Sequence, residues 1–350
     1  MNANTTTPED ARSPWFDGHL DLACIAVEGR DLSVPLAEAV GPPQPASITF
    51  PSLAEGRVIA AMGTIFTGPG IGGPCGYPKL EGLAEAEQAG VKQLEQYHHW
   101  EQAGLIRLVR SAADLPKSDT ADGGPISICL LMEGADPIRE PDDLQRWYDA
   151  GLRVIGMSWS CGTTYAGGNL PPYLPLTTRG EQLVMGMDRL GMIHDVSHLC
   201  ERATWRLLEV SDGPVIASHS NCRALIQEPD WHQQRHLPDE LIRALGDRGA
   251  VIGVNLCSAF LESDESKRAS ITQVADHVER VCQVTQRITA TALGSDMDGG
   301  FPANRLPEGI NRPADLHRIT DELSARGFSD DDLSAFAFGN WHAFLKAHLP

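Results

Sequence analysis

The sequence predicts an α/β protein, a single-domain (β/α)8 TIM-type barrel with long βα loops and a C-terminal helical extension. Short apolar runs alternate with longer amphipathic segments, a pattern typical of parallel strands covered by helices on both faces. Eight such runs occur, which favours a closed barrel over an open sheet. The chain has 350 residues, more than the roughly 250 of a minimal barrel, so we expect additional segments to hold the excess.

The predicted strands are the eight apolar runs at residues 16–23, 58–66, 126–133, 154–159, 192–198, 215–219, 251–256 and 291–296. Most of them follow a residue that favours a turn, such as Gly151 or Pro214. Between the runs, apolar residues recur with helical spacing, most clearly at residues 81–100, 177–190, 201–210, 238–246 and 271–286.

Segments outside this alternation account for the extra length. An insertion spans residues 28–56, and a loop rich in glycine and proline spans residues 68–78. A helical segment at residues 330–348 is expected to cover the outside of the barrel. The polar residues 1–13 are expected to be disordered, which leaves residues 14–350 as one domain.

Composition excludes several classes of partner. Lys and Arg number 28 against 47 Asp and Glu, so the net charge is −19, which argues against nucleic acid and against an anionic membrane surface. The eight cysteines form no C-x-x-C pair and predict reduced, mostly buried thiols, not a disulfide framework or a thiolate zinc site. Residues 1–16 lack the features of a secretory signal, and no apolar stretch approaches a membrane span. We therefore expect a cytoplasmic protein.

Residues of the types that bind metals or transfer protons occur at the C-terminal ends of five of the predicted strands. They are Asp17, His19, Asp21, Glu133, Asp195, His198, His219, Asp296 and Asp298. Active sites of (β/α)8 barrels lie where strands end and βα loops begin, so we expect these side chains to meet. The combined pattern predicts a binuclear metal site.

Three of these residues suit one metal ion. His19 and Asp21 are two positions apart, so on a strand both side chains face the same side. Glu133 ends a buried run, where a carboxylate without a partner would be costly, and a bridge between two cations would satisfy both of its oxygens.

The remaining strand ends suit a second ion and a proton transfer. His198 and His219 offer neutral imidazoles from neighbouring strands, which suit a zinc-like ion. Asp296 is free to act as the acid/base group or to complete a coordination sphere, while Asp298 suits either a supporting or a loop-capping role. Two divalent ions then balance three carboxylates and a bridging hydroxide.

Other motifs are weaker. Residues 68–73 contain G-x-G-x-x-G but lead into Pro74 instead of a helix, so we expect a mobile loop over the site and not a dinucleotide site. Neither Cys161 nor Cys200 has an evident histidine base, which argues against a cysteine nucleophile, and no G-x-S-x-G elbow is present.

At the strand ends the chain resembles the membrane dipeptidase (renal dipeptidase) family of zinc peptidases, in the amidohydrolase superfamily. The similarity extends from residues 17–21 to residues 339–341, and its most specific blocks are 189–198, 214–221 and 294–299. Glu133 followed by Gly134 matches a glutamate bridge, where many relatives in the superfamily use a carboxylated lysine.

The resemblance implies two Zn²⁺ ions per chain and a small peptide substrate. It assigns His19, Asp21 and Glu133 to one zinc, and Glu133, His198 and His219 to the other. It also implies that Asp296 is the acid/base aspartate, and that Arg235 binds the C-terminal carboxylate of the substrate. A hydroxide bridging the ions would attack the scissile carbonyl, with Asp296 passing a proton to the departing amine.

Two positions depart from the family pattern. Trp159 stands where the family commonly has a substrate-contacting histidine, and Cys257 stands where it has a tyrosine. We therefore count Trp159 among the substrate-binding residues and keep lactones, β-lactams and N-acyl amino acids as alternative substrates. A non-catalytic metal-binding barrel is a further alternative, which Asp296 disfavours. The natural substrate, its stereochemistry, the metal used in the cell and a homodimeric state stay open.

Overall fold

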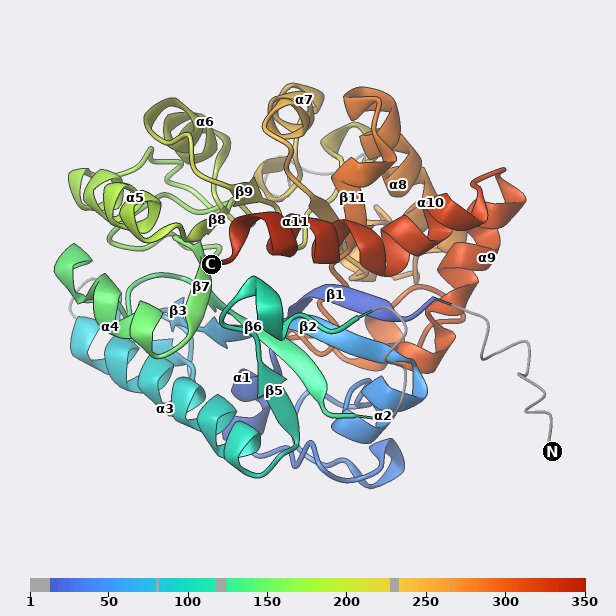
Figure 1. The fold of residues 1–350 in the computed structure, drawn as a ribbon, viewed down its shortest axis with the longest axis horizontal. Helices are drawn as coiled ribbons and strands as arrows, with labels where there is room; N and C mark the ends of the chain where they lie inside the picture. The colour runs from blue at the N-terminus through green and yellow to red at the C-terminus, as the bar shows by residue number, and fades with distance from the viewer. Residues whose placement is uncertain (1–12, 80–81, 118–123, 227–232, 265) are drawn as a thin grey trace.

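The structure is a computed structural model that describes residues 13–79, 82–117, 124–226, 233–264 and 266–350. Figure 1 shows strands in the middle of the molecule with helices around them. Of the N-terminal segment predicted to be disordered, residues 1–12 lie outside the described part. Ser13 is described, and its hydroxyl forms a hydrogen bond of 2.7 Å with that of Ser334.

Each of the eight predicted runs overlaps one strand, although the strands of the first and fourth runs begin one and two residues before the predicted start. The strands are β1 (Trp15–Leu20), β2 (Val58–Phe66), β6 (Ile126–Glu133), β7 (Leu152–Gly156), β8 (Ile193–Asp195), β9 (Val215–Ile216), β10 (Ile252–Val254) and β11 (Thr291–Leu293). The main sheet is parallel, with the order β1-β2-β6-β7-β8-β9, and it forms a half-barrel. An added strand, β5 (Ile106–Leu108), pairs with β6, while β10 and β11 form a second parallel pair.

The register of the main sheet brings the carboxyl ends of its strands to one edge. Successive partners across the strands run from Phe66 to Glu133, Gly156, Asp195 and Ile216. Each of these residues is the last of its strand. Side chains that follow the strands therefore meet at this edge, as the sequence predicts.

The helices confirm the predicted alternation. The described helices are α1 (Leu22–Val27), α2 (Phe50–Glu55), α3 (Leu83–Gln102), α4 (Leu144–Asp149), α5 (Thr178–Leu190), α6 (Glu201–Val210), α7 (Asp239–Asp247), α8 (Ile271–Thr285), α9 (His317–Ala325), α10 (Asp330–Ser334) and α11 (Asn340–His348). Local signals define their ends: the Thr177 hydroxyl accepts the Gly180 N–H at the start of α5, and left-handed Gly191 ends it. Residue 81 of the first predicted helix lies outside the described part.

The C-terminal segment is helical as predicted, but the prediction that it covers the outside of the barrel is wrong. A π-helical turn, Ala335–Gly339, joins α10 to α11. Trp341 and Phe338 belong to the same buried cluster as strand residues Phe16 and Leu131. Figure 1 shows α11 lying across the strands, inside the surrounding helices. The apolar face of α11 thus fills the end of the sheet's interior.

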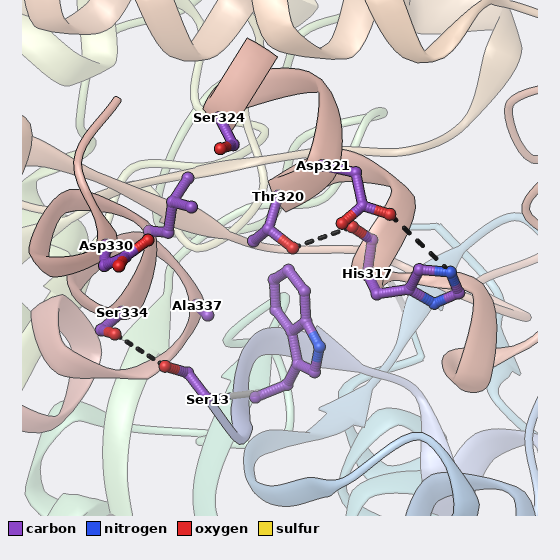
Figure 2. Close-up of a pocket in the computed structure, with 10 residues that line it drawn as sticks. Ser13, His317, Thr320, Asp321, Ser324, Asp330, Ser334 and Ala337 are labelled. Carbon is purple, nitrogen blue, oxygen red and sulfur yellow. Dashed lines mark hydrogen bonds and ion pairs between the residues drawn. The ribbon is translucent and has the colours of Figure 1, made fainter. Parts of the chain in front are cut away.

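A cavity of about 390 Å³ lies at the amino end of β1, where Trp15 lines it. Figure 2 shows His317 pointing toward Asp321 on α9, and their side chains are 4.0 Å apart. The residues lining this cavity include none of the predicted site residues, which all follow the opposite ends of the strands. Among the described residues, no helix is both long and apolar enough to cross a membrane.

Candidate metal centre

Six predicted residues meet at the carboxyl edge of the strands. They are His19, Asp21, Glu133, His198, His219 and Asp296, and all six are buried. Five of them line one side of a cavity of about 540 Å³, together with aromatic side chains. The structure thus brings together side chains that are up to 277 positions apart in the chain (296 − 19).

Glu133 lies between three imidazoles. Its Oε2 is 3.5 Å from Nε2 of His19. Its Oε1 is 2.9 Å from Nε2 of His198 and 3.5 Å from Nε2 of His219. The two oxygens therefore face different histidines, which is the arrangement expected of a carboxylate that bridges two cations.

Two groups of donor atoms are close enough to hold a cation. Donor atoms of His19, Glu133 and His219 lie within 4.8 Å of one another, and so do those of His19, Asp21 and Asp296. His19 belongs to both groups, and its buried Nε2 has no hydrogen-bond partner among the described residues. An orphaned imidazole nitrogen surrounded by carboxylates fits a bound divalent metal.

Asp21 reaches the site by a route that differs from the prediction. It does not lie on a strand with His19, because β1 ends at Leu20 and Asp21 is the residue directly before α1, where its side chain forms no capping hydrogen bond. Its Oδ1 still lies 3.8 Å from Nε2 of His19, and it accepts a hydrogen bond from the Thr64 hydroxyl. The turn into α1, and not strand alternation, places this carboxylate.

Ser218 holds two of the histidines, and sequence reasoning missed it. Its Oγ lies 3.1 Å from Nδ1 of His19, 2.8 Å from Nδ1 of His219 and 2.6 Å from Oδ2 of Asp195. The hydroxyl donates to the Asp195 carboxylate and accepts an N–H from each ring. With Nδ1 of each ring held by Ser218, Nε2 of each ring faces Glu133 and would become the ligand atom once any proton on it is displaced by a metal.

His198 has a different support. Its Nδ1 lies 2.8 Å from the Asn169 side-chain oxygen, which comes from the long loop before α5. His198 itself has a φ of 65° and Asp296 a φ of 59°. This left-handed backbone is uncommon outside glycine and clusters at functional sites. Ser218 could have been predicted from the sequence because it directly precedes His219, whereas no local sequence signal marks Asn169.

Burial and mutual charge shift the pKa values of the site. Burial raises the pKa of Asp296 to about 8, with the nearby carboxylates adding to the effect. Burial alone would lower the pKa of His19, but the carboxylates of Glu133, Asp21 and Asp296 raise it to about 10. Burial lowers the pKa of His198 to about 4, so this imidazole is neutral. The metal-free site therefore holds protons that a cation would displace.

The cavity above the six residues has apolar walls. The Trp159 ring is 5.3 Å from the Phe66 ring and 6.3 Å from the His198 ring, measured between centroids. Cys257 also lines the cavity. Both positions that depart from the family pattern thus face the space where a substrate would lie.

The glycine-rich loop lies beside this cavity. Its strands β3 (Gly68–Pro69) and β4 (Gly76–Tyr77) pair in parallel, and Ile71 between them lines the cavity. The next described helix begins only at Leu83, so no helix N-terminus follows the motif directly.

Arg235 lies behind the cavity wall. It is buried, its Nη2 donates to the His219 carbonyl oxygen at 2.7 Å, and its guanidinium lies 5.0 Å from the centre of the Phe260 ring. Phe260 lines the cavity, whereas Arg235 is not among the lining residues. The role of Arg235 in binding a substrate carboxylate stays a prediction.

Asp298 secures the insertion at residues 28–56. Its carboxylate forms an ion pair with Arg30 and accepts the N–H groups of Ser47 and Ile48. The sequence left open whether Asp298 supports the metal ligands or caps a loop, and these contacts favour the role in capping a loop.

Histidines and carboxylates gathered at the carboxyl ends of parallel strands define a class of metal-dependent hydrolases. The family model of the membrane dipeptidases, peptidase family M19, matches residues 10–347, and the chain belongs to this family. It is therefore a peptide-bond hydrolase.

The chain is also similar to individual curated proteins and solved structures. A Klebsiella pneumoniae protein from the pqqA 5′ region is 33% identical over 254 residues, which cover 70% of this chain and 89% of the relative. Dipeptidase aclJ of Aspergillus oryzae is 27% identical over 308 residues, which cover 84% of this chain and 68% of that protein. A Rhodobacter sphaeroides metallopeptidase, solved with a phosphinate mimic of L-Ala-D-Ala, has the same fold: the TM-score is 0.82 at 24% identity, covering 96% and 99% of the two chains.

Proposed function

We propose that this protein is a binuclear zinc dipeptidase. The observation that carries the proposal is the position of Glu133, whose two oxygens face His19 on one side and His198 and His219 on the other. One zinc would be held by His19, Asp21 and Glu133, and the other by Glu133, His198 and His219. Bound divalent ions supply polarisation of the scissile carbonyl and activation of water.

Asp296 is proposed as the acid/base group. It is buried beside His19 and Asp21, and its Oδ2 accepts a hydrogen bond of 2.9 Å from the Asn255 amide. In the metal-free protein burial raises the pKa of Asp296 to about 8, and a carboxyl group positioned beside the reacting atoms can both accept and release a proton. Asp296 would take a proton during attack on the peptide bond and deliver it to the departing amine.

The cavity walls suit a small peptide. Phe66, Trp159 and Phe260 offer apolar surface, and Arg235 supplies positive charge behind Phe260. The ligand of the Rhodobacter sphaeroides relative is a dipeptide mimic, which supports the same substrate class here. Trp159 and Cys257 favour one alternative, an amidohydrolase that acts on a lactone, a β-lactam or an N-acyl amino acid.

We also infer that the eight strands form a closed (β/α)8 barrel. A parallel bridge between Ala217 and Ile252 links the end of the main sheet to the β10–β11 pair. On the other side, the Asp296 N–H donates to the His19 carbonyl oxygen at 3.2 Å, which links the segment after β11 to β1. These contacts support closure on both sides of the pair.

A hydrolysis screen of the zinc-loaded protein tests the proposed function. Free dipeptides should be cleaved in preference to lactones, β-lactams and N-acyl amino acids, and elemental analysis should find about two zinc ions per chain. Cleavage of an alternative class with no dipeptide turnover would overturn the substrate assignment. Zinc near zero, with no activity gained when zinc is added, would overturn the metal centre itself.

A further inference from the structure

A second group of metal-ligand side chains lies beside the cavity entrance, outside the proposed catalytic centre. Donor atoms of Cys24, Glu28 and Cys75 lie within 4.8 Å of one another. Cys24 belongs to α1, which begins directly after Asp21, and Glu28 caps the end of the same helix. Cys75 comes from the glycine-rich loop, where its carbonyl oxygen accepts the Gly68 N–H at 3.0 Å. Two segments far apart in the chain thus contribute to one cluster.

The two thiols face each other in a buried place. The exposed fraction is 7% for Cys24 and 1% for Cys75. The hydrogen bond between the thiols, together with burial, raises the pKa of Cys24, so this sulfur stays protonated without a metal. Neither thiol has a role in the proposed hydrolysis.

Glu28 completes the cluster from the solvent side. Its Oε1 lies 3.5 Å from the position that a side chain on Gly73 would occupy, so the carboxylate reaches across to the loop that carries Cys75. Glu28 and Cys24 both line the 540 Å³ cavity. Burial raises the pKa of Glu28, even though the residue is exposed.

We propose that Cys24, Cys75 and Glu28 form a third metal site, which binds one thiophilic divalent cation such as Zn²⁺ and ties the glycine-rich loop to α1. Two thiolates and a carboxylate are suitable zinc ligands, and water would take the fourth position. Binding releases the two thiol protons to solvent as two metal–sulfur bonds form, with no electron transfer. The proposed ligands of the catalytic centre are nitrogen and oxygen donors, so a thiolate signal that depends on Cys24 and Cys75 reports the third site.

Cadmium is the probe that separates the two kinds of site. Thiolate-to-cadmium charge transfer absorbs in the near ultraviolet, whereas cadmium bound by histidine and carboxylate lacks this band. We expect cadmium added to reduced, zinc-loaded protein to produce a band that saturates at about one ion per chain. Cys282→Ser, a half-buried cysteine on α8, serves as the control and should leave the titration unchanged.

Three variants locate the site. Cys24→Ser and Cys75→Ser should each lose about half of the band and bind cadmium roughly tenfold or more weakly, because one sulfur remains. Glu28→Gln should keep the whole band and weaken binding several-fold. This exposed substitution keeps the proposal testable if a cysteine variant fails to fold.

Three results would overturn the proposal. The first is no band in wild-type protein whose eight thiols all titrate after unfolding. The second is a band that neither cysteine variant reduces, or affinity that Glu28→Gln leaves unchanged. The third is a mass two hydrogens lower with a peptide linking Cys24 to Cys75, because the pair would then be a disulfide.

Discussion

Glu133 shows how a single residue sets the chemistry of the site. Its exposed fraction is 4%, and a carboxylate buried without partners would cost several kcal/mol. Burial alone would raise its pKa, but His19 and His198 hold that pKa below its usual range. The group is therefore an anion in the folded protein, with an imidazole on each side, before any cation binds.

Ser218 controls the orientation of His19 and His219, so its hydroxyl should matter for metal binding. Ser218→Ala removes the acceptor for both Nδ1–H groups, and we expect zinc affinity to fall roughly 10- to 100-fold. Competition against a chromophoric chelator measures this change. Ser220→Ala is the matched control, because the Ser220 hydroxyl contacts Ser197 and Arg235 but no imidazole. Equal losses in both variants would show that Ser218 has no specific role.

Asp296 is expected to transfer the proton during hydrolysis, and the zinc ions should not depend on it for binding. Asp296→Asn keeps the shape of the side chain, so zinc content should stay near that of the wild type. The value of kcat should fall by at least about 100-fold, the usual contribution of a positioned acid/base group. Steady-state kinetics and elemental analysis of the same preparation measure both quantities. Near-normal turnover would exclude the acid/base role.

The kinetics of an Arg235 variant can show whether this residue binds the substrate carboxylate or has a structural role. Arg235→Lys should lower kcat/KM for free dipeptides by roughly tenfold, because lysine cannot form two parallel hydrogen bonds with a carboxylate. A dipeptide amide has no such carboxylate and should lose little. Equal losses on both substrates would instead assign Arg235 to holding the His219 carbonyl oxygen, which it contacts at 2.7 Å.

At the scale of elements, α11 packs against the strands at one end of the sheet. Trp341 is fully buried, and its Nε1 donates to the Leu293 carbonyl oxygen at 2.7 Å. A side chain on Gly18 would lie 2.7 Å from the Trp341 ring, so glycine is needed in β1 where the helix approaches. Packing of α11 and the path of β1 are therefore coupled.

This coupling predicts a large loss of stability in Trp341→Ala. Removal of a buried tryptophan leaves a cavity and an unpaired carbonyl, which together cost about 3–5 kcal/mol. Trp205→Ala on the surface of α6, where the side chain is partly exposed, should change stability much less. Urea unfolding of both variants tests the comparison, and equal midpoints would show that α11 contributes little to the core.

At the scale of the whole molecule, the fold gathers negative charge around the site and so links metal binding to pH. In the metal-free protein the pKa of His19 is raised to about 10 and that of Asp296 to about 8, so both hold a proton at neutral pH. A cation must displace such protons from its ligands, and metal affinity therefore rises with pH.

We expect zinc affinity to increase roughly tenfold per pH unit for each displaced proton between about pH 6 and 8. Competition titrations in a series of buffers measure the slope. His19 remains protonated over this whole range without metal, so at least one proton should be released throughout. An affinity that does not change with pH would contradict the proposed ligand role of His19.

The sequence by itself determined where the strands lie and which residues follow them. Parallel strands covered on both faces are largely apolar, so β2 and β6 were visible as long, mostly apolar runs. Because the carboxyl ends of parallel strands share one edge, the order of the chain was enough to bring His19, Glu133 and His219 together.

Only the tertiary structure decided the contacts that depend on packing between distant segments. Asp21 reaches the site through the start of α1, and Ser218 serves two histidines at once, because local backbone turns set those directions. The amphipathic pattern of α11 showed that one face is buried, but not against which surface. The approach of Cys75 to Cys24 likewise depends on how a loop folds back, since hydrophobic periodicity carries no information about loop paths.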